Sequence, residues 1–217
     1  MGTLIASAII LSARQAIQDL QAVRWTDTAL LEYLNEAQLE ISRYKPDSCI
    51  KNETFSTTSG IVQQLPSDAI RLIDVVCNVG GSAITQVDRK GLALQNPGWP
   101  KETASSSIKA FMYHDADPTR FYVYPPAASG ASLAVVYSAR PAVVAAADPI
   151  SLTDEYKSSL IHYICFKCFS EDSMSPDANK ASMYHQLFIN SLQMSDAADK
   201  TVEPVSSFKA PLYGGSK

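Results

Sequence analysis

Two cysteines one helical turn apart could form a redox site or a metal site. Cys165 and Cys168 form a Cys-x-x-Cys pair, and His162 lies a further turn back. Thiolate and imidazole groups in such an arrangement are typical of redox sites and zinc sites. The pair lies well inside a helical pattern, however, and no second Cys/His pair at zinc spacing follows, so one helix face offers too few ligands. The sequence therefore favours buried structural cysteines, and we expect no metal and no cofactor.

The best candidate for a catalytic site is the run from His114 to Asp117, His-Asp-Ala-Asp, which could supply a base and a metal-binding carboxylate. Aspartate followed by Pro118 is also what a hairpin turn requires, and we favour that interpretation. The sequence contains no G-x-S-x-G elbow, no P-loop, no G-x-G-x-x-G and no H-E-x-x-H. The other two histidines, His162 and His185, fall in helical patterns, so we do not expect an enzyme.

Composition limits the class of protein. The 217 residues are 46% hydrophobic and 18% charged, which is ordinary for a folded chain with a sizeable core. The net charge of −4 argues against a self-sufficient nucleic-acid binder, because such binding needs lysine and arginine to neutralise phosphates. The four cysteines, which include Cys49 and Cys77, are too few for a disulfide scaffold and predict free thiols. The apolar run 4–11 is too short to span a bilayer and lacks a basic leader, so no membrane segment is expected.

The elements that must position these residues begin with two helices, over 3–20 and 26–44. Thr26 is a suitable N-cap for the second helix, and Pro46 ends it. The second helix carries one apolar stripe at helical spacing, made of Leu30, Leu34, Ala37 and Ile41. We therefore predict a pair of core-facing helices at the front of the chain.

The middle of the chain has a different character. Glycine, proline, serine, threonine and valine become frequent between residues 54 and 144, and the apolar runs shorten. Gly80-Gly81 and Asp115–Pro118 are typical of hairpin connections. The pattern predicts a small antiparallel β domain of about six strands, inserted between helical flanks.

The last third returns to helical periodicity. Thr153 or Asp154 can cap a helix over 155–171, and Pro176 favours a new helix from 177 to about 194. Two helices before and two after a β insert would pack most economically as a four-helix bundle. The predicted fold is therefore α+β: helical pairs at 1–50 and 151–198, a β-sandwich-like domain at 51–150, and an extended arm at 199–217.

The arm at 199–217 has no periodicity and contains Pro204, Pro211 and a Gly-Gly pair. It is nevertheless too apolar for a solvated tail. Two interpretations stay open: a loose chain end, or an arm that docks its hydrophobic side chains on a neighbour.

The order of several short stretches resembles the head-to-tail adaptor (connector) proteins of tailed bacteriophages. The stretches are "RWTDTALLEYLNEAQLEI", "LPSDAIRLIDV", "DRKGLALQNPGW", "FYVYPP", "VVYSARP" and "SLTDEYKSSLIHYICFKCFSED". The resemblance implies a virion protein, made in the bacterial cytoplasm, that assembles as a homo-oligomeric ring, typically of twelve copies. Such a ring joins the portal protein to the tail or nozzle, and genomic DNA passes through its lumen without sequence-specific binding.

The resemblance assigns residues to packing and interfaces rather than to a catalytic site. It places six residues in the bundle core: Trp25, Leu30, Leu34, Tyr156, Leu160 and Tyr163. The interface with the portal or a neighbouring subunit would use Phe208, Leu212 and Tyr213. Trp99 could anchor a loop on a neighbour or, equally, cap the β domain's own core.

Two other functions would use different residues of the same chain. A carbohydrate- or peptide-binding module would use Trp99 and Tyr124 of the β domain. A hydrolase or redox enzyme would depend on His114 or Cys165.

Overall fold

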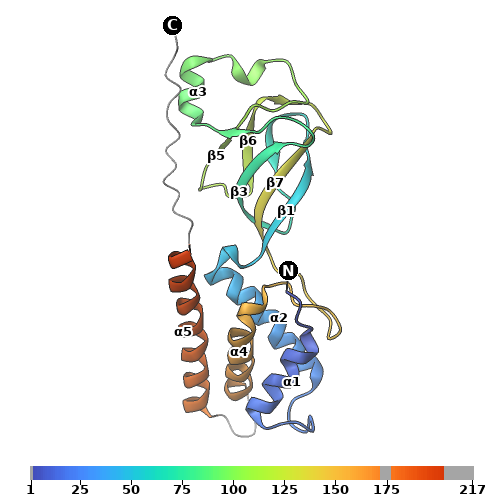
Figure 1. Ribbon diagram of the computed structural model, residues 1–217, viewed down its shortest axis with the longest axis vertical. Coiled ribbons are helices and arrows are strands. Elements are labelled where there is room, and N and C mark those ends of the chain that lie inside the picture. The colour runs from blue at the N-terminus through green and yellow to red at the C-terminus, as the bar shows by residue number, and fades with distance from the viewer. Residues whose placement is uncertain (1, 172–176, 203–217) are drawn as a thin grey trace. The chain divides into compact units, whose positions relative to one another are not determined.

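A computed structural model of the chain describes residues 2–171 and 177–202, with side chains to residue 193. The described residues form an α+β protein with five α-helices and two β-sheets (Figure 1). The chain divides into two compact units, one of Met1–Ala8 and Asn35–Asp154, the other of Ile9–Leu34 and Glu155–Lys217. No described helix is long and apolar enough to cross a membrane.

The two helices predicted at the front of the chain are confirmed. They are α1 (Ala6–Ile17) and α2 (Asp27–Tyr44). The Thr26 hydroxyl accepts a hydrogen bond from the backbone N–H of Ala29 at 3.2 Å, so Thr26 caps α2 as expected. Pro46 opens the short 3-10 helix η1 (Pro46–Ser48) directly after α2 ends. The predicted stripe on α2 is buried, with Leu30, Leu34, Ala37 and Ile41 all fully inaccessible to solvent.

The β domain consists of two sheets with strand orders β1-β7-β3 and β2-β6-β5-β4. The strands are β1 (Ile50–Ser56), β2 (Gly60–Gln64), β3 (Ala69–Asn78), β4 (Thr85–Gln86), β5 (Ala110–Tyr113), β6 (Arg120–Ala127) and β7 (Ser132–Ala139). Every pairing is antiparallel except that of β4 with β5, which is parallel and departs from the predicted all-antiparallel pattern. β1 was not predicted, because its Lys-Asn-Glu-Thr centre lacks the apolar alternation of a half-buried strand.

β3 pairs with β7 through a repeated irregularity. Ten residues of β3 lie opposite seven residues of β7, with a register shift at each of three places. The residues left over are Ile70, Ile73 and Val76, each the extra residue of a β-bulge. The buried positions of β3 therefore recur every three residues, at Ala69, Leu72, Val75 and Asn78.

Both predicted turns are confirmed. Gly80 adopts a positive φ of 72°, and Gly81 donates its N–H to the carbonyl of Asn78 at 2.8 Å, which closes the turn after β3. The His114 carbonyl accepts from the N–H of Asp117 at 2.9 Å in the turn that joins β5 to β6.

A short helix, α3 (Arg89–Gln95), follows β4 and was not predicted. Its N-cap is Asp88, whose carboxylate accepts from the N–H of Gly91 at 2.7 Å. The 3-10 helix η2 (Trp99–Lys101) comes next and buries the Trp99 ring. The capping residue was visible in the sequence, but Gly91 and the short length hid the helical period.

The segment after β7 is fixed to the start of the chain. Ala6 and Ser7 donate their N–H groups to the carbonyls of Asp148 and Ala146, at 2.9 and 3.0 Å. The Asn35 side chain of α2 bonds to both backbone groups of Val144, at 2.9 and 3.1 Å. This segment is therefore held by the N-terminal residues and by α2.

Asp154 has a different partner from the one predicted. Its carboxylate accepts from the backbone N–H groups of Thr3 and Leu4, at 2.7 and 3.1 Å, and from the Thr3 hydroxyl. These hydrogen bonds, the one from the Thr3 side chain first, lower the pKa of Asp154. The N-cap of α4 (Lys157–Ser170) is Tyr156, which makes no side-chain capping bond, so the predicted cap by Asp154 is wrong.

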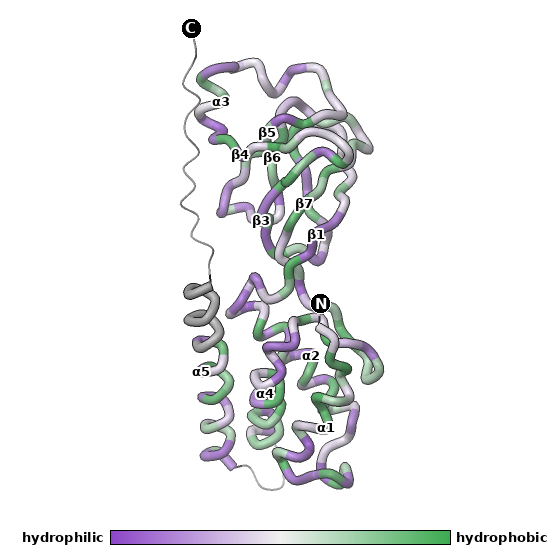
Figure 2. Tube along the Cα trace, viewed as in Figure 1, coloured by the Kyte–Doolittle hydropathy of each residue, from purple (hydrophilic) through white to green (hydrophobic). Residues whose placement is uncertain are grey.

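The second unit contains a closely packed pair, α4 and α5 (Ala178–Val202). The hydroxyls of Ser159 and Ser191 lie 2.7 Å apart across the pair. The Tyr163 ring meets Phe188 edge-on, with centroids 5.2 Å apart. Figure 2 shows hydrophobic residues interleaved with hydrophilic ones along α1 and α4, as expected for helices that bury one side.

Candidate interaction surfaces

The Cys-x-x-Cys pair lies in the core of the helical unit. Cys165 and Cys168 are 0% and 1% exposed on α4. Burial raises the pKa of each thiol to about 12, so both stay protonated at neutral pH. A buried, protonated thiol is a poor nucleophile and a poor metal ligand. Within residues 2–171 and 177–193, no three His, Cys, Asp or Glu side chains gather as a metal site.

The His114–Asp117 run forms the β5–β6 turn. The Nδ1 atom of His114 accepts a hydrogen bond from the N–H of Ala116 at 3.1 Å. One imidazole nitrogen is therefore already used in shaping the turn. This geometry agrees with the turn interpretation of the sequence.

The six residues assigned to the bundle core all lie in the second unit, though not equally deep. Leu30, Leu34 and Leu160 are fully buried, and Tyr156 is buried. Trp25 and Tyr163 are half-buried. The Trp25 ring lies edge-on to Tyr33, with centroids 6.1 Å apart.

The residues assigned to interfaces are partly buried or lie outside the described residues. Trp99 is only 5% exposed, so as placed it offers little surface to a neighbouring subunit or to a sugar ring. Tyr124 is half-buried and its hydroxyl lies 3.3 Å from a Glu102 carboxylate oxygen. Phe208, Leu212 and Tyr213, together with the rest of the arm beyond residue 202, lie outside the described residues.

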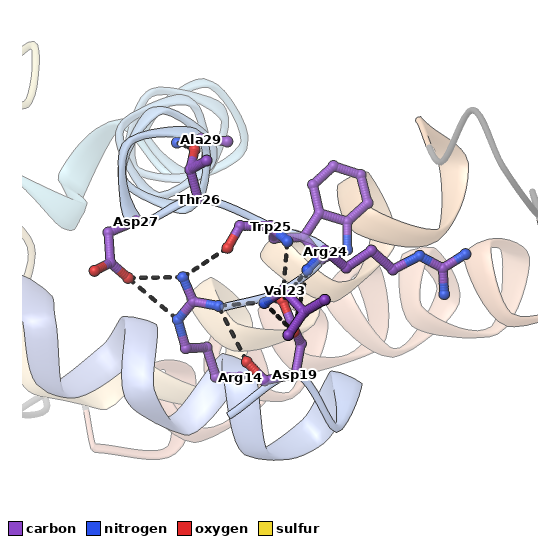
Figure 3. A network of polar contacts seen from close by, with 8 residues as sticks. All are labelled: Arg14, Asp19, Val23, Arg24, Trp25, Thr26, Asp27 and Ala29. Atoms are coloured by element: carbon purple, nitrogen blue, oxygen red, sulfur yellow. Dashed lines mark hydrogen bonds and ion pairs between the residues drawn. The ribbon is translucent and has the colours of Figure 1, made fainter. Parts of the chain in front are cut away.

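A buried ion pair that the sequence analysis missed shapes the loop between α1 and α2 (Figure 3). Arg14 is only 4% exposed, and its guanidinium donates to the carboxylate of Asp19 at 3.2 Å and to that of Asp27 at 2.7 Å. It also donates to the backbone carbonyls of Asp19 and Trp25, at 3.1 and 2.8 Å. Arg14 therefore ties the end of α1 to the start of α2.

The carboxylate of Asp19 organises the loop from inside. It accepts hydrogen bonds from the backbone N–H groups of Val23, Arg24 and Trp25, the shortest at 2.9 Å (Figure 3). Burial by itself would raise the pKa of Asp19, but these backbone bonds and the Arg14 charge outweigh burial and lower it. The charged carboxylate thus acts as the centre around which residues 19–25 fold.

The loop from Gln18 to Trp25 carries backbone strain and exposed apolar side chains. Gln18 and Ala22 have positive φ angles, 59° and 53°, which cost non-glycine residues about 1 kcal/mol or more each. Leu20 and Val23 project into solvent, 58% and 86% exposed. The hydrogen bonds of the Arg14–Asp19 pair offset the strain of these two positive φ angles. The loop therefore exposes Leu20 and Val23 on a backbone that is held by internal hydrogen bonds. We call residues 18–25 the apical loop.

One signal in the sequence pointed to this network. Arg14 is the only charged residue of α1, a helix otherwise rich in isoleucine and alanine, and it follows the buried Ile10 by four residues. A lone charge on the buried side of an apolar helix needs a partner, since an unpaired buried charge is costly. The partner could not be chosen from the sequence, because Asp19 and Asp27 were both within reach.

The sequence was compared with models of known protein families. The family model of the SU10 adaptor protein matches residues 4–207, which covers both units. The chain belongs to the SU10 adaptor protein family. It is a phage head-to-tail adaptor-type family, so this member is a structural protein of a bacteriophage and a component of the virion. Among curated proteins, none matches the sequence.

Membership in the SU10 adaptor family indicates what kind of protein this chain is and what kinds of protein it contacts. Such a family is not normally enzymatic, and its members interact with portal and tail proteins in general. The resemblance to phage adaptors is confirmed at this level.

Proposed function

We propose that this chain forms a homo-oligomeric ring of twelve copies that joins the portal to the tail or nozzle and continues the DNA channel. The observation that carries the proposal is the family match, because it runs through the helical segments and the β domain alike. The net charge of −4 supports a channel wall that does not hold phosphates strongly.

We further propose the domain organisation in which helical pairs at 1–50 and 151–198 form a four-helix bundle. Three described contacts within the second unit support it. Arg14 of α1 pairs with Asp27 of α2, and Tyr33 of α2 donates its hydroxyl to Glu171 at the end of α4, at 2.9 Å. α4 and α5 share the Ser159–Ser191 contact. The β domain at 51–150 is then an insertion into the bundle.

In this proposal two surfaces serve the ring. The apical loop contributes Leu20 and Val23, because a strained and internally bonded loop binds with little further loss of conformational entropy. The arm at 199–217 contributes Phe208, Leu212 and Tyr213 as hydrophobic anchors on the portal or a neighbouring subunit. A closed ring needs two different faces on each subunit, and these surfaces are different.

The test is the mass of the purified protein, alone and mixed with its cognate portal, by native mass spectrometry or light scattering. We expect association with the portal in fixed stoichiometry. Deletion of residues 199–217 should abolish it, whereas deletion of 214–217, which keeps all three anchors, should not. Failure of the full chain to associate with the portal would refute the adaptor function proposed for this chain.

A further inference from the structure

β1 is an edge strand with a regular, open edge. It lies beside β7 at the edge of the sheet (Figure 1). The two strands pair residue for residue over seven positions, without a bulge. Ala139 donates to the Cys49 carbonyl at one end, and Thr57 donates to the Ala131 carbonyl at the other. Antiparallel pairing alternates, so β1 residues between these two positions turn their backbone groups outward at every second place. The outward residues are Ile50, Asn52, Thr54 and Ser56, all exposed.

The opposite edge of the same sheet is blocked. β3 carries three bulges against β7, and its extra residues include Ile73 and Val76, both about two-fifths exposed. Bulges disrupt the regular row of donors and acceptors that another strand needs, and this is a common protection of sheet edges. The sheet therefore protects one edge and leaves the other able to accept a strand.

An aromatic ring lies near the C-terminal end of the open edge. Phe55 of β1 is half-buried, and its ring lies 5.7 Å from that of the fully buried Phe121. Phe55 therefore lies on the edge strand and contacts the core through its ring. A strand added beside β1 would place one of its side chains next to Phe55, and an aromatic partner would be favourable there.

The arm of this chain contains a segment suited to that edge. Residues 205–210, Val-Ser-Ser-Phe-Lys-Ala, lie between Pro204 and Pro211 and contain no proline. Prolines remove the N–H donor and so limit a strand to the residues between them. When Phe208 lies opposite Phe55, residues 205–209 face β1 in parallel addition and residues 207–210 face it in antiparallel addition. Pairing of β1 with β1 of a second copy is a two-fold contact that closes at two subunits and builds no ring.

We propose that residues 205–210 of one subunit add as a strand to the β1 edge of a second copy, with Phe208 beside Phe55. The inference rests on the proposed ring, since the arm and the β1 edge are the two unlike faces that a head-to-tail contact requires. The backbone bonds supply affinity, and the Phe208–Phe55 contact sets the register.

Disulfide trapping between two different proteins tests the proposal. The first carries Thr54→Cys and lacks residues 203–217, so it offers only the edge. The second is full-length and carries Ser207→Cys or, in turn, Lys209→Cys. Both carry Cys77→Ser, because Cys77 is half-exposed while the other native cysteines are buried. Opposed residues in paired strands lie within disulfide reach.

We expect a disulfide-linked heterodimer, recognised by its mass, in the adaptor mixture and in the mixture with portal. When Phe208 faces Phe55, residue 207 faces Thr54 in parallel strands and residue 209 faces Thr54 in antiparallel strands. Trapping by Ser207→Cys therefore indicates parallel addition, and trapping by Lys209→Cys indicates antiparallel addition. Ser216→Cys, outside the proline-bounded segment, should give no heterodimer. Absence of heterodimer in both mixtures overturns the proposal.

A variant of the edge separates strand addition from chance collision. Ser56→Pro in the first protein removes only an outward N–H, so the β1–β7 pairing keeps its bonds and the heterodimer should be lost. Ser56→Val keeps the N–H and should retain the heterodimer. Equal trapping in both variants overturns strand addition. Portal association without trapping refutes this inference alone, and trapping without portal association refutes the adaptor function alone.

Discussion

Gly2 and Arg14 show how single residues fix the local structure of this adaptor family member. Gly2 is buried against the segment that follows β7, in the unit that holds the β domain. Arg14 is buried in the helical unit, where it has two carboxylates and two carbonyls as partners. We therefore expect an added side-chain carbon at Gly2, or loss of the charge at Arg14, to lower the stability of the protein.

Gly2→Ala is expected to destabilise the protein. A methyl carbon at Gly2 would lie 2.4 Å from the Leu152 carbonyl oxygen and 2.8 Å from an Asp154 carboxylate oxygen, so the backbone must shift. Overpacking of this kind costs about 1–3 kcal/mol, which thermal denaturation would record as a lower Tm. Gly98→Ala is the matched control, because its nearest neighbour would be at 3.6 Å. Equal Tm values for the two variants would contradict the close fit at Gly2.

Arg14→Met should cost more than the loss of any surface ion pair. It leaves the buried Asp19 carboxylate without its cation, and breaking a buried pair costs about 3–5 kcal/mol. Arg43→Met breaks the exposed pair with Glu40 and should cost less than about 1 kcal/mol. Chemical denaturation of both variants measures the difference. Similar free energies of unfolding would show that the Arg14 network does not hold the apical loop.

At the scale of elements, α4 and α5 enclose a histidine with an unsatisfied nitrogen. The Nδ1 atom of His162 is buried without a hydrogen-bond partner among the described residues, and the ring lies 6.3 Å from that of Tyr184. Burial lowers the pKa of His162, so the folded protein keeps the ring neutral. We therefore expect the stability of this helix pair to depend on pH.

The thermal stability of the protein should fall on acidification through about pH 6.5, the ordinary pKa of histidine. The unfolded chain takes up a proton there, whereas folded His162 resists it, so the lower pH favours unfolding. His162→Phe should reduce the slope of Tm against pH between 7.5 and 5.5. His185→Gln, an exposed position on α5, is the control. An unchanged slope in His162→Phe would mean that another group carries the effect.

Elements with a strong period were predictable, and those governed by tertiary contacts were not. α2 was predicted with its cap because Thr26, the apolar stripe and Pro46 are local signals. β1 was missed because an edge strand can be polar on both faces. Asp154 was assigned to the wrong element, since nothing local indicates that its acceptors serve Thr3 and Leu4. The Arg14 network likewise depends on a loop conformation that no sequence period encodes.

At the scale of the whole molecule, the family match indicates a structural protein that acts through contacts with other proteins. Cys165 and Cys168 are buried, His114 shapes a turn and Trp99 packs inside the β domain. Two candidate contact features are described in full, the apical loop and the β1 edge. The predicted start of the extended arm at residue 199 is wrong, because α5 continues to Val202; the rest of the arm, with Phe208, Leu212 and Tyr213, lies outside the described residues.

The protein is expected to bind duplex DNA weakly or not at all at physiological salt. With 22 acidic and 18 basic residues, its net charge of −4 gives little release of counterions from phosphates. A gel-shift titration at about 0.15 M salt should show no retarded band at micromolar protein, and lowering the salt should change this little. A salt-dependent shift with a steep slope would contradict a weakly interacting channel wall.

The three-to-two pairing of β3 with β7 has a consequence for how this domain varies in length. Each bulge repeat uses three residues of β3 against two of β7, and the buried residues of β3 keep the same phase from one repeat to the next. Loss of one residue from β3 would turn a buried position such as Leu72 or Val75 toward solvent. Loss of three from β3 together with two from β7 would keep the remaining residues of β3 in the same inward and outward phase. Insertions and deletions in relatives should therefore be found in these paired steps, which an alignment of natural variants can test.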